Sequence, residues 1–86
     1  MPEISRFFGI VIRMFFDDHS PPHLHADYAG NGARIGLDPI TVLESQLPPR
    51  ALAMVLEWTA LHQQELLDNW GRLHTGQQPI KVAPLS

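Results

Sequence analysis

The residues best suited to chemistry are three histidines within a seven-residue stretch, His19, His23 and His25, followed closely by Asp27. Imidazole nitrogens and carboxylate oxygens are ligands that zinc, iron, nickel and copper take in proteins. Two residues that lie two positions apart on a β-strand point to the same side, so His23 and His25 would act together. With His19 reaching in from the preceding loop, this pattern predicts a site for a divalent transition metal such as zinc at His19, His23, His25 and Asp27.

The same imidazoles are also suited to general acid–base catalysis. One histidine would remove a proton while the other, held charged by a neighbouring aspartate, delivers one. Arg34, on the same predicted sheet face, would hold a phosphate or a carboxylate. This set, His23, His25 and Arg34, suits a small toxin-like ribonuclease. However, six basic residues against nine acidic ones give a net charge of −3. The chain therefore lacks the basic excess of a dedicated nucleic-acid binder, and RNA enters only as a transient substrate.

A third interpretation of the histidine stretch involves no chemistry. A half-buried antiparallel strand needs a polar outer face, and His, Asp and Arg side chains can fill such a face. Against this stands their concentration, because three of the five histidines fall within seven residues. All three interpretations stay open from sequence, and so does the choice of Asp18, Asp27 or Asp38 as an oxygen ligand.

The elements that position these residues begin with two predicted stretches of strand. Alternating apolar residues predict a first strand over about residues 4–16, in which Gly9 marks a bulge or bend. A hairpin is predicted over about residues 22–38, with its turn in the Gly-rich segment 29–32. A four-residue loop there would set Asp27 opposite Arg34, whereas a two-residue turn at Asn31-Gly32 would set His25 opposite Asp38. Either register places the same polar residues on one face: His23, His25, Asp27, Arg34 and Asp38.

The rest of the chain predicts a short strand, a long helix and an extended tail. The short strand covers about residues 41–47, and an apolar stripe at helical spacing predicts one helix over about residues 49–74. Residues 77–86 would form the tail. Together these elements predict a single α+β domain over residues 1–86, in which a small antiparallel sheet of three to four strands packs against one long C-terminal helix.

Composition narrows the classes of protein further. The chain has no cysteine, which excludes disulfides and thiolate zinc sites. The N-terminal segment does not resemble a signal peptide, and no apolar run approaches the roughly 20 residues of a membrane span. We therefore expect a cytoplasmic protein without membrane association. Four apolar residues exceed what one core stripe needs, which predicts a homodimer or a complex with a small partner protein: Phe7, Phe15, Met54 and Trp58.

Two long segments, ISRFFGIVIRMFFDDHSPPHLHADY and LPPRALAMVLEWTALHQQELLDNW, resemble a family of short bacterial proteins, the domain-of-unknown-function family 4160. The shared pattern is I-x-R-F-x-G-I-x-I, H-x-P-P-H-x-H-A, L-P-x-R-A and E-W…H…E-L…N-W. The family has no established activity, and the resemblance implies only a gene arrangement similar to toxin–antitoxin pairs. We therefore expect a small binding or interaction module with a candidate metal site on its histidine-rich strand. The ribonuclease remains the alternative, so whether the chain is an enzyme stays open.

Overall fold

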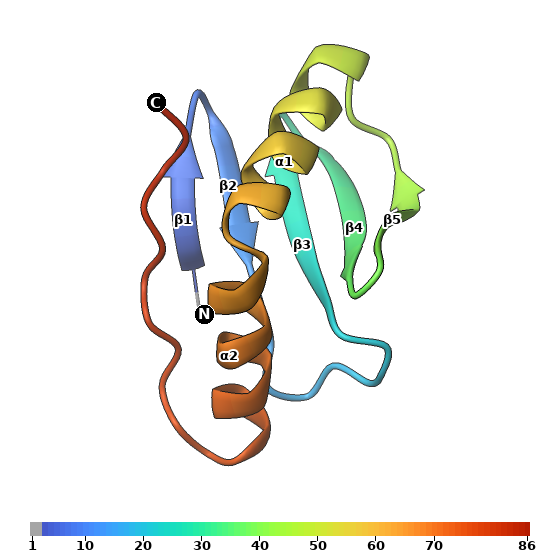
Figure 1. Ribbon diagram of the computed structural model, residues 1–86. Helices are drawn as coiled ribbons and strands as arrows, with labels where there is room; N and C mark the ends of the chain where they lie inside the picture. The colour runs from blue at the N-terminus through green and yellow to red at the C-terminus, as the bar shows by residue number, and fades with distance from the viewer. Residues whose placement is uncertain (1–2) are drawn as a thin grey trace.

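The computed structural model describes residues 3–86, which form one antiparallel sheet with two helices on one of its faces (Figure 1). The five strands lie in chain order across the sheet, so each pairs with its neighbour in sequence. The elements are β1 (Glu3–Phe7), β2 (Ile10–Arg13), β3 (His23–Tyr28), β4 (Asn31–Leu37), β5 (Ile40–Ser45), α1 (Pro49–Leu61) and α2 (Gln63–His74). The predicted α+β class is confirmed. The predicted three to four strands and single long helix are wrong.

The predicted first strand over residues 4–16 is two strands joined by a tight turn. Phe8 and Gly9 both have positive φ, at 50° and 80°, and Phe7 pairs with Ile10 across the turn. Two consecutive residues with positive φ match the twist of antiparallel strands in a two-residue hairpin. The apolar pattern hid this turn because Phe7 and Phe8 are both aromatic, so the alternation shows no interruption where the chain reverses.

The hairpin of β3 and β4 turns at Ala29-Gly30, two residues earlier than an Asn31-Gly32 turn. His25 consequently pairs with Arg34, and neither predicted register is correct. The shift moves the pairing by an even number of positions, so each side chain still takes the predicted face. Leu24 pairs with Ile35 beneath the helices, and both are buried.

The predicted helix over residues 49–74 is interrupted at His62, which has a φ of −122° and separates α1 from α2. Two side-chain hydrogen bonds accompany the break. The Thr59 hydroxyl donates to the carbonyl of Val55, a pattern that bends helices, and the Gln63 amide donates to the carbonyl of Leu37 at the end of β4. The second bond fixes the start of α2 to the sheet. None of the helices within residues 3–86 is long and apolar enough to cross a membrane.

The chain after α2 runs back past the helices and lies beside β1 (Figure 1). The Val82 amide donates to the carbonyl of Ile4, and the indole N–H of Trp58 donates to the carbonyl of Ala83. Trp58 itself is fully buried and packs on Phe7 with the ring centroids 5.3 Å apart. Two of the residues that suggested a partner protein are therefore part of the core of a single chain.

Candidate metal centre

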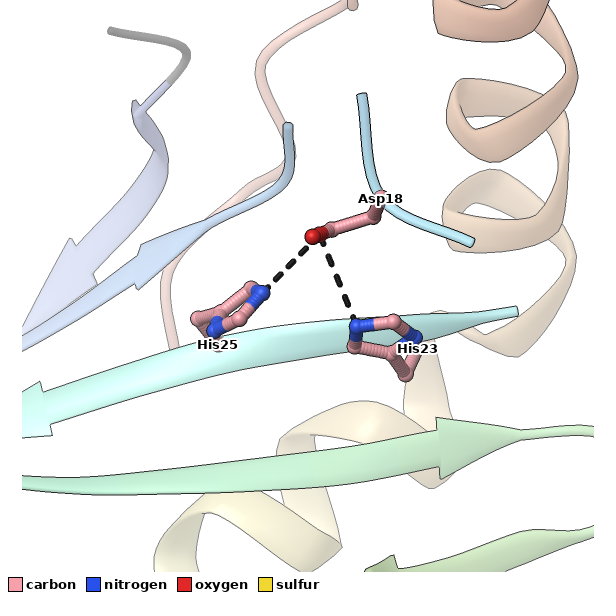
Figure 2. Close-up of side chains that lie close together, drawn as sticks. All are labelled: Asp18, His23 and His25. Carbon is pink, nitrogen blue, oxygen red and sulfur yellow. Dashed lines mark hydrogen bonds and ion pairs between the residues drawn. The ribbon is translucent and has the colours of Figure 1, made fainter. Parts of the chain in front are cut away.

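Asp18, His23 and His25 converge at the end of the sheet where β3 begins (Figure 2). Strand β3 supplies both histidines, whose side chains share a face because they are two residues apart. Asp18 comes from the loop between β2 and β3, and its Oδ2 lies 2.9 Å from Nε2 of His25 and 3.5 Å from Nε2 of His23. One potential ligand atom from each residue lies within 4.8 Å of the other two.

A backbone carbonyl determines which nitrogen of His23 faces the cluster. Nδ1 of His23 lies 2.7 Å from the carbonyl oxygen of Pro21, which can only accept a hydrogen bond, so Nδ1–H is the donor. In the neutral ring this leaves the lone pair on Nε2, directed towards Asp18. Such a hydrogen bond from the second ring nitrogen is the usual support for a metal-binding histidine. The side chain of His23 is buried, whereas His25 is partly exposed.

Aromatic contacts hold the two imidazole rings in place. His23 and His25 pack edge to face with centroids 5.2 Å apart, and Phe15 packs against the other side of His25 at 4.8 Å. From helix α2, Trp70 lies 5.4 Å from the ring of His23. Rings held between neighbours in this way lose little further freedom when they bind a ligand.

His74, near the end of α2, connects the helix to the loop that carries Asp18. Its Nε2–H donates to the carbonyl of Asp18 and its Nδ1–H donates to the carbonyl of Trp70, each at 2.8 Å. These two bonds, the one to Asp18 foremost, raise the pKa of His74, because two acceptors favour the imidazolium. The contact with Asp18 spans 56 residues of sequence.

The structure brings together only part of the predicted metal set. His23 and His25 are in the cluster, but His19 is exposed on the loop and lies outside it. Asp27 is also outside, because its carboxylate pairs with Arg13. Asp18 takes the oxygen position. It was one of three carboxylates open from sequence, and its place depends on a loop path that strand spacing does not describe.

In the predicted catalytic set of His23, His25 and Arg34, the arginine is engaged in an ion pair with Glu44. Arg34 lies opposite His25 in the sheet, but its guanidinium donates twice to Oε1 of Glu44 on β5. Arg13, on the other side of β3, is bound to Asp27. Both arginines beside His25 on this face are therefore already paired with carboxylates.

The donor set can hold a metal ion with coordination positions to spare. Ligand atoms about 2.1 Å from a tetrahedral ion are about 3.4 Å apart. The Asp18 distances of 2.9 and 3.5 Å lie on either side of that value, and the three ligand atoms together lie within 4.8 Å of one another. Two imidazole nitrogens and one carboxylate oxygen suit zinc, iron, nickel or copper. Three protein ligands leave at least one position for water or another molecule, as in catalytic rather than structural zinc sites.

Comparison with known proteins adds a family and no activity. The family described as a domain of unknown function (DUF4160) matches residues 9–71, a segment that contains Asp18, His23, His25 and Trp70. No curated protein and no solved structure matches the chain. The matched segment covers β2 to the last turn of α2, most of the fold described above. This match confirms the family resemblance that the sequence motifs indicated. The chain belongs to the DUF4160 family.

Proposed function

We propose that this protein is a small binding module that holds a divalent transition-metal ion at Asp18, His23 and His25. The observation that carries the proposal is the fixed orientation of His23. Its Nδ1–H is committed to Pro21, so its remaining nitrogen faces a carboxylate oxygen at 3.5 Å inside a buried setting. Zinc is the first ion to test, because the donors are two nitrogens and one oxygen.

The contact between His23 and Asp18 supports a bound cation. A neutral His23 would place a lone pair beside a carboxylate oxygen, and two acceptors that face each other repel. A cation between them, whether a proton or a metal ion, removes that repulsion. A metal ion would do so for all three donor atoms at once and would replace the proton through which His25 now bonds Asp18.

The test is metal binding by the untagged full-length chain, followed by calorimetry and by elemental analysis of the dialysed protein. We expect about one zinc ion per chain, with loss of binding in Asp18→Asn and in His25→Ala. The matched controls are His19→Ala and Asp27→Asn, which change the same residue types just outside the cluster. Unaltered binding in Asp18→Asn, or binding lost in both controls, would contradict the proposed site.

A second function, RNA cleavage, draws its support from the closeness of the two imidazoles, whose centroids are 5.2 Å apart. It requires Arg34 to leave Glu44 and bind phosphate, so the ion pair weighs against it. The ribonuclease hypothesis predicts that expression arrests growth with the wild-type chain and not with His25→Ala. Equal growth of the two strains, together with no cleavage of a fluorogenic RNA, would refute it.

Assembly with a second copy or with a small partner protein also remains a proposal. Phe7 and Trp58 are used within the chain, so support now comes from exposed apolar side chains elsewhere: Phe8, Phe16, Leu61 and Ile80. Sedimentation at micromolar concentration tests the homodimer, and a monomer mass would refute it.

A further inference from the structure

We infer that the last turns of α2, through Trp70 and His74, position the metal ligands and so set the metal affinity of the site. The inference rests on the proposed function and adds a controlling element to it. Neither residue donates to the metal. Each contacts a ligand residue instead, Trp70 the ring of His23 and His74 the backbone of Asp18.

The contacts form a closed circuit around the site. His25 bonds Asp18, and the carbonyl of Asp18 accepts from His74. The ring of His74 stacks on Trp70 with centroids 4.3 Å apart, Trp70 packs against His23, and His23 packs against His25. A circuit of this kind restrains each ligand from two sides, so removing one member loosens the others.

Asp18 depends on this circuit more than the histidines do. His23 and His25 are held by the backbone ladder of β3, whereas Asp18 lies in a loop whose neighbours Asp17 and His19 are exposed. The amide of Asp18 makes a turn bond to Phe15 at 3.3 Å, and its carbonyl bonds His74 at 2.8 Å. The shorter bond fixes the loop to a helix from the far end of the sequence.

Docking of α2 and binding of metal must influence each other to the same extent. If docking of α2 raises the affinity for metal, metal must stabilise the docking of α2 by the same factor. Helix α2 also carries Asn69 and Arg72, which bond the tail at Ile80 and Gln78. Metal occupancy is therefore coupled to the C-terminal part of the chain, far in sequence from the ligands.

The experiment compares zinc dissociation constants in the untagged full-length chain for His74→Ala and His62→Ala. His62, at the junction of α1 and α2, is the matched control. Like His74 it packs on a tryptophan, Trp58, with ring centroids 5.3 Å apart, and its Nδ1 bonds Glu65, but it is not part of the Asp18, His23 and His25 cluster. We expect His74→Ala to raise the dissociation constant about 10- to 100-fold and His62→Ala to leave it within about threefold. His74→Gln, whose amide can still donate to Asp18, should recover part of the loss.

A second readout separates positioning from general destabilisation. In a Trp58→Phe background Trp70 is the remaining tryptophan. Its ring centroid lies 5.4 Å from that of His23, so cobalt bound through His23 should quench its fluorescence. Unfolding of the metal-free variants by urea shows whether stability changed.

Each outcome of these measurements has a definite meaning. A dissociation constant for His74→Ala within threefold of wild type, or an equal rise in His62→Ala, would overturn the inference and leave the proposed function standing if Asp18→Asn abolishes binding. A wild-type chain that binds neither zinc nor cobalt would overturn both.

Discussion

At the scale of single residues, His74 makes folding sensitive to pH. Both of its ring nitrogens donate to carbonyls, of Asp18 first and of Trp70 second, which raises its pKa in the folded state above the ordinary value of 6.5. A raised folded-state pKa means that the folded protein binds the proton more tightly than the unfolded chain. The stabilisation is therefore complete below pH 6.5 and is lost as pH rises through the raised pKa.

This predicts that the metal-free protein gains stability on going from about pH 8 to about pH 6, and that His74→Gln gains less. Only the difference between the two proteins reports His74, because the other histidines titrate in the same range. Thermal melting in the presence of a chelator measures it. An identical pH profile for the two proteins would show that the two hydrogen bonds do not distinguish the protonation states.

Asn69 is a buried amide that fastens the tail to α2. Its Nδ2 donates to the carbonyl of Ile80 and its Oδ1 accepts from the amide of the same residue, at 2.7 and 2.8 Å. We predict that Asn69→Ala lowers the free energy of unfolding by about 2 kcal/mol, since two hydrogen bonds are lost while Ile80 stays accessible to water. Asn69→Asp should cost more, because it sets a second acceptor against the Ile80 carbonyl. Urea denaturation measures both, and a smaller loss for aspartate would contradict the assigned orientation of the amide.

At the scale of elements, the turn between β1 and β2 carries a conformation that phenylalanine tolerates poorly. Phe8 has a φ of 50° and its side chain is 61% exposed, so little packing offsets the strain. Asparagine favours this position of a two-residue hairpin, and we predict that Phe8→Asn raises the free energy of unfolding by about 1 kcal/mol. Phe16→Asn is the control, because Phe16 is 71% exposed and is not among the residues with positive φ. A loss of stability in Phe8→Asn would indicate that this aromatic ring has a packing role.

The sequence predicts which face a side chain takes better than it predicts where the chain turns. Period-two alternation correctly separated Leu24 from His25, because an error of two residues in register leaves both faces unchanged. The turn at residues 8–9 went unrecognised, and the turn predicted within residues 29–32 was placed too late, because neither Phe8 nor Ala29 is a residue that usually adopts positive φ. No proline marks the break at His62, where the accompanying bonds come from Thr59 and Gln63.

The candidate site was predictable where it lies on a strand and not where it lies on a loop. The pairing of His23 with His25 follows from strand geometry alone. Asp18 and His74 do not, because their contact joins a loop to a helix 56 residues later. Asp27 has the spacing that places it on the same strand face as His23 and His25, but its carboxylate forms an ion pair with Arg13 on the neighbouring strand. The sequence did not predict this ion pair, because it did not predict that β2 pairs with β3.

At the scale of the whole molecule, one edge of the sheet is covered by the C-terminal tail and the other is exposed. The tail lies beside β1 (Figure 1) and bonds it through Val82. At the other edge, β5 exposes Val42 and Leu43. An uncovered strand edge pairs readily with other chains. The tail therefore both contributes to the core and covers one edge.

Deleting residues 77–86 tests this double role of the tail. The deletion removes the buried Val82 side chain, worth about 2 kcal/mol, and takes hydrogen-bond partners from Trp58 and Asn69, at about 1–3 kcal/mol each. The sum is comparable to the entire stability of a domain of this size, about 4–13 kcal/mol. We predict that the truncated chain is largely unfolded, or folded only with a dimeric or larger mass because β1 becomes an open edge. Removal of the exposed Ser86 alone, which leaves Val82, Ala83 and the core-packed Leu85 in place, should cost little. Urea denaturation and size-exclusion chromatography measure the two effects, and a truncated chain that unfolds cooperatively at the wild-type midpoint as a monomer would show that the tail only rests on the surface.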